Sequence, residues 1–248
     1  GNKSEVKNYL LNRGINEETI KTFQIGFAPE GWDNLSTFFK KNLDSEAQKI
    51  DAGLFKTSEK NNRVYDVFRN RIIFPIKSHR DQIIGFGGRV IDSSDNPKYL
   101  NSSDSEVFKK GRELYGLSEI LKNKKRVNRI IVVEGYTDVL SLFSNDIRYA
   151  VATLGISTSK VHIDKLFTHV DEIIFCFDGD EAGVKAAESA LNTGLSGLRD
   201  GKKIRFMFLP QCEDPSSLLE KEGKEQFEKR IENSKVLSEY LVENILNQ

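Results

Sequence analysis

The sequence predicts an α/β protein: a mixed α+β N-terminal subdomain, then a parallel α/β sheet, then C-terminal helices. Apolar runs alternate with helical patterns in the second half, and the longest run is far below the roughly 18 to 20 residues of a membrane span. With 248 residues, 38% hydrophobic and 30% charged, the chain can bury one large core or two small ones. We therefore expect a globular protein without contact to a membrane.

The first half mixes short helices with strands. We expect helices at 4–13, 16–23 and 32–42, and strands at 71–76 and 82–86 with a charged turn between them. The charged segment 122–126 then interrupts the pattern. We place an N-terminal subdomain at residues 1–123.

The second half alternates strands with helices. Strands are expected at 130–133, 149–152, 173–177 and 204–209, and helices at 136–143 and 182–198. Nearly continuous β-branched and aromatic runs are typical of strands covered on both faces. Parallel strands also need crossover helices, and 182–198 provides one. These elements define a second subdomain at residues 124–212.

Residues 213–248 form a third segment, which we expect to be the start of a longer helical region. Two amphipathic helices are predicted over 215–248. The positions expected to face the core are Phe227, Ile231, Leu237, Tyr240 and Leu241. Because the chain begins with Gly rather than Met and shows no apolar leader, we expect a piece of a longer cytoplasmic protein.

Carboxylates follow two of the predicted strands. Glu134 comes directly after 130–133, and Asp178 and Asp180 flank the glycine after 173–177. Because ligands bind at the carboxyl edge of open α/β sheets, we expect these side chains to meet there. Oxygen ligands without His or Cys favour Mg²⁺ or Mn²⁺ over zinc. The simpler alternative is that Asp180 only caps the following helix.

Two further carboxylates can join this edge. Asp138 lies one helical turn after Glu134, and Asp214 follows the fourth predicted strand. The three histidines show no ligand spacing, and the two cysteines, Cys176 and Cys212, form neither a disulfide framework nor a zinc pattern.

The net charge of zero, 37 basic against 37 acidic residues, hides a division along the chain. Residues 60–126 hold 15 basic and 8 acidic residues, whereas 130–180 hold 3 and 8. A basic block beside acidic residues suits a protein that handles nucleic acid near a cation.

The candidate phosphate-binding residues of the basic block are Arg71, Arg89, Lys98 and Lys110. The aromatic residues between them, expected to stack on bases, are Phe68, Phe86, Tyr99, Phe108 and Tyr115. The alternatives are a solvated charged surface, an ion pair of Arg71 with Asp66, and a hairpin turn at 85–89.

Seven segments, in one order along almost the whole chain, resemble the catalytic core of DnaG-type bacterial primases, which has the Toprim fold. They are 65–76 (YDVFRNRIIFPI), 85–89 (GFGGR), 97–102 (PKYLNS), 110–117 (KGRELYGL), 133–138 (VEGYTD), 175–183 (FCFDGDEAG) and 213–215 (EDP).

The resemblance implies roles for individual residues. Glu134, Asp178 and Asp180 match the principal acidic metal residues, with Asp138 and Asp214 as additional ones. Arg89 and Lys98 match basic positions near the active site, and Arg13 in the YLLNRG segment is a further member of that group. The family often continues its last acidic motif as Asp-Pro-Asp, whereas this chain has Ser216. A full set of peripheral metal sites is therefore not expected.

The activity implied is synthesis of short RNA primers from ribonucleoside triphosphates on a single-stranded DNA template, dependent on Mg²⁺ or Mn²⁺. The implied monomer would work with a replicative helicase, through a C-terminal domain outside this sequence, and with a single-stranded-DNA-binding protein. Zinc is expected only in an N-terminal domain, also outside this sequence.

Three other function classes remain open at this stage. One is a Toprim nuclease or topoisomerase, although none of the seven tyrosines has the context of a nucleophile. Another is an aspartate-nucleophile phosphatase, in which an Asp would stand where Glu134 does. The third is a non-catalytic single-stranded-DNA-binding recombination module, for which three clustered carboxylates would be a disadvantage.

Overall fold

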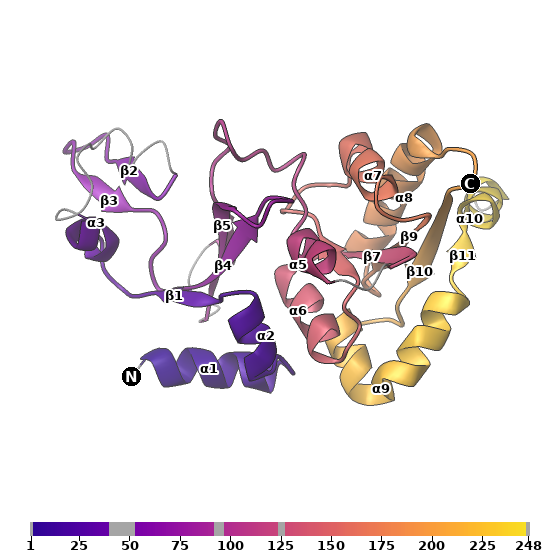
Figure 1. Ribbon diagram of the computed structural model, residues 1–248, viewed down its shortest axis with the longest axis horizontal. Coiled ribbons are helices and arrows are strands. Elements are labelled where there is room, and N and C mark those ends of the chain that lie inside the picture. Colours follow the sequence, from indigo (N-terminus) through magenta and orange to yellow (C-terminus); the bar gives the residue numbers. More distant parts are fainter. Residues whose placement is uncertain (1, 40–52, 92–96, 124–126, 247–248) are drawn as a thin grey trace.

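A computed structural model describes residues 2–39, 53–91, 97–123 and 127–246 of the chain. An N-terminal part, with its helices below and beside a small sheet, lies next to a larger sheet covered by helices (Figure 1). The predicted fold class, mixed helices and strands followed by a parallel sheet, is confirmed.

The N-terminal helices are α1 (Asn2–Asn12), α2 (Glu17–Thr22) and α3 (Asn34–Phe39). The side chain of Asn16 begins α2 by accepting a hydrogen bond from the backbone N–H of Thr19 at 2.9 Å. The first two predicted helices are confirmed. The third is confirmed over α3, while 40–42 fall outside the described residues.

The small sheet is antiparallel, in the order β1 (Gly26–Ala28), β4 (Arg71–Lys77), β5 (Ile83–Val90) and β6 (Tyr99–Asn101). The strands β2 (Phe55–Thr57) and β3 (Val64–Asp66) pair separately. Both predicted strands are therefore confirmed as β4 and β5. The suggestion that 85–89 forms a hairpin turn is wrong, because these residues lie inside β5, where all five pair with β4 and residues 87–89 also pair with β6.

The larger sheet contains β7 (Arg129–Val133), β8 (Ala150–Ala152), β9 (Glu172–Phe177), β10 (Lys203–Phe208) and β11 (Lys235–Val236). Its order is β11-β10-β9-β7-β8. The four predicted strands run parallel, and only the short edge strand β11 is antiparallel. The carboxyl ends of β7 and β9 are therefore neighbours.

Helices cover both faces of this sheet. They are α5 (Leu117–Lys122), α6 (Tyr136–Ser144), α7 (Lys160–Phe167), α8 (Glu181–Gly197), α9 (Pro215–Glu232) and α10 (Leu237–Leu246). Strand residues such as Ile131 and Ile174 share a core cluster with α6 and α9, whereas Ile130 and Ile173 share one with α7, α8 and α10. Because both faces are covered, the strands are apolar at successive positions.

The C-terminal segment follows its prediction. Phe227, Ile231, Leu237 and Tyr240 are buried, and Leu241 is partly buried against the same core. The two predicted helices are α9 and α10, and β11 separates them.

The N-terminal part and the larger sheet meet through aromatic contacts on α6. Phe74 of β4 stacks on Tyr136 with ring centroids 5.2 Å apart, and Phe23 meets Phe143 edge to face at 5.1 Å. The core cluster of α6 includes residues of α1 and β4. The boundaries at 123/124 and 212/213 stay predictions, and this cluster extends across both of them.

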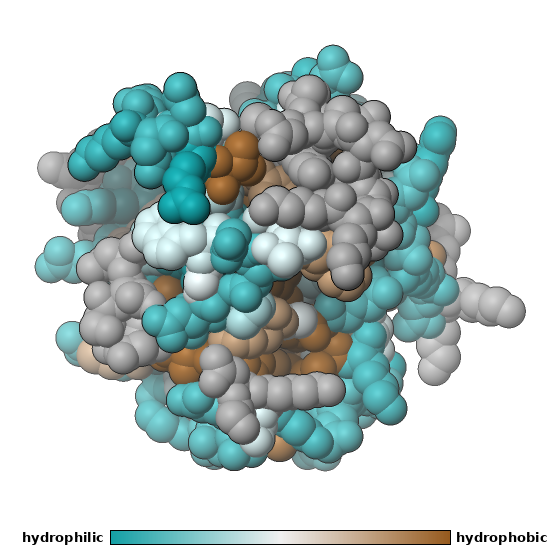
Figure 2. All heavy atoms as spheres, turned by 90° about the vertical axis from the view of Figure 1, so that its left-hand side faces the viewer, coloured by the Kyte–Doolittle hydropathy of each residue, from teal (hydrophilic) through white to brown (hydrophobic). Residues whose placement is uncertain are grey.

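The face presented by the N-terminal part is mixed in character. Patches of hydrophobic residues lie between hydrophilic ones in this view (Figure 2). Among the described helices, none is both long enough and apolar enough to cross a membrane.

Candidate active site at the carboxyl edge of the sheet

The predicted acidic residues come together at one edge of the larger sheet. Glu134 directly follows β7 and Asp178 directly follows β9, and these two strands are paired. The backbone N–H of Asp178 donates to the Glu134 carboxylate. Asp180 lies two residues further on and contributes to the electrostatic field on both groups.

The turn containing Gly179 brings in the loop after β10. The N–H of Gly179 donates to the Glu213 carbonyl at 3.1 Å, and the N–H of Cys212 donates to the Gly179 carbonyl at 3.1 Å. A Cβ at Gly179 would overlap the carbonyl of Pro210, so only glycine allows this approach. The two loops are thereby joined, and Asp214 is brought toward Asp178.

Three of the carboxylates cap helices that begin at this edge. Asp138 accepts from the N–H of Gly135 at 3.0 Å, Asp180 from Gly183 at 2.8 Å, and Asp214 from Ser217 at 2.7 Å. Asp180 therefore does cap α8, and this cap is compatible with a second role at the acidic edge. Capping uses one lone-pair direction of a carboxylate and leaves the others available.

Burial and mutual repulsion raise the proton affinity of the cluster. Desolvation raises the pKa of Asp138 to about 8, with further contributions from the charges of Asp178 and Asp214. Desolvation and the charge of Glu134 raise the pKa of Asp178 to about 7. The pKa of Glu134 is also raised, mainly by partial desolvation of its carboxyl group, although the residue as a whole is exposed. The edge therefore carries excess negative charge that protons or a cation can neutralise.

The chemistry of this donor set fits a hard divalent cation. All the candidate ligand atoms are carboxylate oxygens, and one oxygen of Asp178 is buried without a hydrogen-bond partner among the described residues. Within that same part of the chain, no three acidic, His or Cys side chains already surround one point as ligands. Glu134 and Asp180 are exposed, so their side chains are the ones with room to turn inward.

Ser216, which stands where the family often has Asp, is already engaged. Its hydroxyl donates to the Arg13 carbonyl at 3.2 Å and lies 3.0 Å from the Ser141 hydroxyl. This places Arg13 beside the loop that carries Asp214. The Arg13 guanidinium itself lies 5.5 Å from the ring centroid of Tyr9.

Arg89 lies next to the acidic edge and is buried. Its guanidinium donates to the Tyr99 hydroxyl at 2.6 Å and lies over the rings of Tyr9 (5.4 Å) and Tyr99 (5.1 Å). It also reaches the Thr137 hydroxyl at 3.4 Å, one residue before Asp138. Its Nε is buried without a hydrogen-bond partner in the described residues.

The other predicted basic residues surround Arg89 at different depths. Arg71 is buried and donates to the Pro97 carbonyl at 2.7 Å, so it supports the segment that carries the exposed Lys98. Lys110 is partly buried, and its N–H donates to the Asp104 carboxylate at 3.1 Å.

The structure also shows the surroundings of Asp66 and of the five aromatic residues in the basic block. The carboxylate of Asp66, considered as a partner of Arg71, accepts from the N–H groups of Leu35 and Ser36 at 2.6 and 3.0 Å. Of the five aromatic residues that could supply base stacking, Phe68, Phe108 and Tyr115 are buried in the core and offer no free face to bases. Tyr99 remains 36% exposed, and Phe86 is partly buried.

Sequence reasoning missed three uncharged residues that connect the two parts near this edge. The Tyr136 hydroxyl donates to Asn101 at 2.7 Å, and the Asn101 amide donates to the Leu154 carbonyl at 2.8 Å. Thr137 contacts Arg89, as described above. Asn101, Tyr136 and Thr137 lie inside segments 97–102 and 133–138, and their membership in these segments was the one available signal.

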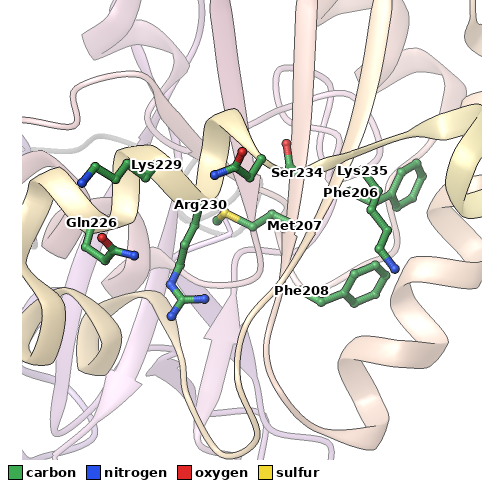
Figure 3. Close-up of a pocket in the computed structure, with 9 residues that line it drawn as sticks. Phe206, Met207, Phe208, Gln226, Lys229, Arg230, Ser234 and Lys235 are labelled. Atoms are coloured by element: carbon green, nitrogen blue, oxygen red, sulfur yellow. The ribbon is translucent and has the colours of Figure 1, made fainter.

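A cavity of about 380 Å³ opens beside Glu134. Its walls come from the ends of β7 and β9 and from residues 153–158, which follow β8. A second cavity, of about 490 Å³, lies against β10 and the end of α9, with Met207, Phe208 and Arg230 among its walls (Figure 3). None of the five acidic candidates lines the second cavity, so it is separate from the acidic edge.

Comparisons with known proteins agree with this arrangement. The family described as DNA primase catalytic core, N-terminal domain, matches residues 1–121, and the Toprim-like family matches residues 131–219. The DNA primases of Salmonella typhimurium and Escherichia coli K12 are each 48% identical to the chain over 98% and 99% of its length. The chain spans only 41% and 42% of these two relatives.

Solved structures extend the match to the fold. The E. coli primase catalytic core is 48% identical, with a TM-score of 0.93 over 99% of this chain and 78% of that one. A DnaG primase catalytic domain bound to single-stranded DNA is also 48% identical, with a TM-score of 0.91 over 98% of this chain and 78% of that one. Identity and coverage at this level show that the chain belongs to the family of DnaG primase catalytic cores.

Proposed function

We propose that this chain is the catalytic core of a bacterial DNA primase, which makes short RNA primers from ribonucleoside triphosphates on single-stranded DNA. The observation that carries the proposal is the meeting of Glu134, Asp178 and Asp180 at the end of paired parallel strands, beside the buried Arg89. The likeness to a primase domain bound to single-stranded DNA supports the choice of template.

Glu134, Asp178 and Asp180 would hold Mg²⁺ or Mn²⁺ in this proposal, with Asp138 and Asp214 close by. When bound, such a cation supplies charge neutralisation on the triphosphate and activation of the attacking 3′-hydroxyl. The capping hydrogen bonds of Asp180 and Asp214 fix the direction of these carboxylates before a nucleotide arrives. The chain thus contributes positioned negative charge, and the proposal requires no general base.

The basic residues would hold phosphates and template. The contacts of Arg89 with aromatic rings and with the Tyr99 hydroxyl hold its guanidinium in one position, so its positive charge is already in place when a substrate binds. Lys98 is exposed, and Lys110 and Arg13 are partly buried, which leaves them able to contact a DNA backbone. Arg71 acts through the segment that carries Lys98.

Primer synthesis by purified protein tests the proposal. The unmodified chain should incorporate labelled ribonucleotides on single-stranded DNA with Mg²⁺ or Mn²⁺. The double variant Asp178→Ala, Asp180→Ala should make primers at least about 100-fold more slowly, because removal of one electrostatic catalytic group typically costs that much in rate. Asp200→Ala removes a carboxylate before β10, at the opposite edge, and should behave as the unmodified chain. Primer synthesis that survives the double substitution would overturn the proposal.

The same preparation distinguishes the other function classes. Relaxation or nicking of supercoiled DNA with Mg²⁺ would favour a Toprim nuclease or topoisomerase. DNA binding without incorporation at any concentration of Mg²⁺ or Mn²⁺ would favour a non-catalytic module.

The setting of the enzyme is part of the proposal. We expect a cytoplasmic monomer at the replication fork, with a replicative helicase and a single-stranded-DNA-binding protein as partners of the whole protein. A zinc-binding domain and a helicase-interacting domain would belong to the whole protein as well.

A further inference from the structure

We propose that the cavity beside Glu134 binds the ribose of a ribonucleotide, and that Thr153, Ser157 and Thr158 recognise its 2′-hydroxyl. This inference rests on the proposed function and deepens it, because it assigns the selection of RNA precursors over DNA precursors to a particular set of side chains.

The cavity has an apolar floor and a hydroxyl-bearing wall. Its volume of about 380 Å³ lies within the range of small-molecule sites. Val132, Val133 and Phe177 contribute from the strands, and Ala186 from α8. The remaining wall, residues 153–158, contributes the three hydroxyl side chains.

These hydroxyls are available for a ligand. Among the hydrogen bonds between described residues, none involves the side-chain oxygen of Thr153, Ser157 or Thr158. The next hydroxyl along the chain behaves differently, because Ser159 donates to the Gly111 carbonyl at 3.0 Å and caps α7. Ser157 is exposed and Thr153 and Thr158 are partly buried, so all three side chains remain open to a polar ligand in the cavity that they line.

The wall is held in place from both ends. Asn101 donates to the Leu154 carbonyl at 2.8 Å, and Ser159 fixes the start of α7 to the Gly111 segment. A preformed wall lowers the entropy cost of binding, and its hydroxyls stay in register with the ligand.

The charge of the cavity selects the part of the nucleotide that can enter. No Lys or Arg lines the cavity, and Glu134 does. The cavity therefore offers a phosphate no basic side chain as a partner. In this proposal the phosphates are held outside it, by the cation at Glu134, Asp178 and Asp180 and by Arg89, while the sugar enters the cavity. A ribose is uncharged and carries two vicinal hydroxyls that can both donate and accept, which matches Ser and Thr side chains.

Such a site distinguishes ribose from 2′-deoxyribose by the 2′-hydroxyl that the latter lacks. A bound sugar would cover these hydroxyls, and a 2′-deoxyribose would cover them without offering a hydrogen-bond partner. A site built to bond a substrate hydroxyl rejects the analogue that lacks it. Each hydrogen bond lost corresponds to about a five- to tenfold change in selectivity.

The experiment compares ribo- and deoxyribonucleotides on hydroxyl-deleted variants of the whole chain. Thr153→Val, Ser157→Ala and Thr158→Val are each measured for the ratio of ATP to dATP affinity by titration calorimetry with Mg²⁺. We expect that ratio to fall about five- to tenfold in at least one variant, because dATP affinity is retained while ATP affinity is lost. Ser238→Ala, on the exposed side of α10, is the matched control and should keep the ratio of the unmodified chain.

A second experiment distinguishes whether the cavity binds the ribose of the incoming nucleotide or the ribose at the primer terminus. Extension of a primer ending in a 2′-deoxynucleotide is compared with extension of an all-RNA primer, so that a change confined to this arm assigns the cavity to the primer terminus. A change in either arm supports the proposal, whereas unchanged sugar selectivity in all three variants overturns it. If the unmodified chain bound nucleotides with this selectivity but made no primers, the proposed function would fail while the ribose site stood.

Discussion

At the scale of single residues, Gly87 shows how closely the two parts of the molecule approach each other. It lies in β5, and a Cβ there would be 2.6 Å from the ring of Tyr136 on α6. We expect Gly87→Ala to lower the free energy of unfolding by roughly 1 to 3 kcal/mol, because the Tyr136 ring would have to move from its stack on Phe74. Urea denaturation measures the change.

The control for this prediction is another strand glycine. Gly26 lies in β1, where an added Cβ would have nothing within 4 Å, so Gly26→Ala should change the free energy of unfolding by about 0.5 kcal/mol or less. Equal stabilities of the two variants would show that the contact with Tyr136 does not limit the size of residue 87.

His162 makes a residue-scale prediction about pH. Burial lowers the pKa of its imidazole, whose Nδ1 accepts from the Ser159 N–H at 3.2 Å while Nε2 faces the Lys110 carbonyl at 3.3 Å. The folded chain therefore keeps the ring neutral when the unfolded chain, with a pKa of about 6.5, already binds a proton. Stability from this group is present above about pH 6.5 and is lost as pH falls toward the folded pKa.

The measurement is the free energy of unfolding at pH 7.5 and at pH 5.5. The unmodified chain should lose more stability on acidification than His162→Gln, which has no ring to protonate. His79→Gln, on the exposed turn between β4 and β5, should retain the full loss. If His162→Gln showed the same pH dependence as the unmodified chain, protonation of this ring would not be the cause.

At the scale of elements, Asp180 has two roles that substitutions can separate. It caps α8 through the Gly183 N–H at 2.8 Å, and it belongs to the acidic edge. Asp180→Asn keeps a good cap and removes the charge, so stability should stay within about 0.5 kcal/mol. Asp180→Ala should cost about 1 kcal/mol of stability. Both variants should lose primer synthesis if the charge is what the reaction needs.

Thermal unfolding and primer synthesis are measured together on both variants. Activity that persists in Asp180→Asn and is lost only in Asp180→Ala would mean that Asp180 acts by positioning α8. In that case the acidic site would consist of Glu134 and Asp178 without it.

Some of the helices and strands could be predicted from the sequence, and others could not. Strands β7 and β9 were predictable because continuous apolar runs mark strands covered on both faces, and the carboxylates after them then had to share an edge. The strands β1, β2, β3 and β6 have only three residues each, too few to show a period. Helices α5 and α7, of 6 and 8 residues, were missed as well, although α2 and α3 are equally short and were predicted, so length alone does not explain the difference.

The site could be predicted only in part, because local sequence patterns do not show how side chains pack. Aromatic residues placed between basic ones do not reveal which side of the backbone they face, so Phe108 and Tyr115 were taken for stacking surfaces although they are buried. The depth of Arg89 depends on the docking of β5 against α6, a tertiary contact that no local pattern encodes. Charge and spacing predicted where the carboxylates lie; only packing shows that Asp138 is buried.

At the scale of the whole molecule, the zero net charge is a balance between two adjoining regions. The basic excess lies in residues 60–126, which hold 15 basic and 8 acidic residues, whereas Glu134, Asp178 and Asp180 lie at the edge of the larger sheet. Nucleic acid held by the basic residues would therefore run close to a cluster of carboxylates. These repel phosphates until a cation neutralises them.

This arrangement predicts that Mg²⁺ strengthens binding of single-stranded DNA at constant ionic strength. Ordinary screening by salt weakens such binding, so a matched titration, in which Mg²⁺ replaces an equivalent ionic strength of monovalent salt, isolates the specific effect. Since the pKa of Asp178 is raised to about 7 and that of Asp138 to about 8, protons already neutralise part of the cluster at pH 6. The gain from Mg²⁺ should therefore be larger at pH 8.5 than at pH 6.

Fluorescence anisotropy with a labelled single-stranded oligonucleotide gives the dissociation constants. We expect them to fall several-fold on addition of Mg²⁺ at pH 8.5, and to fall less at pH 6. The double variant Asp178→Ala, Asp180→Ala lacks the repelling charges, so it should bind DNA more tightly than the unmodified chain without Mg²⁺ and respond little to its addition. A Mg²⁺ effect of equal size in the variant would place the cation on the DNA rather than on the protein, and the two charged regions would then act independently.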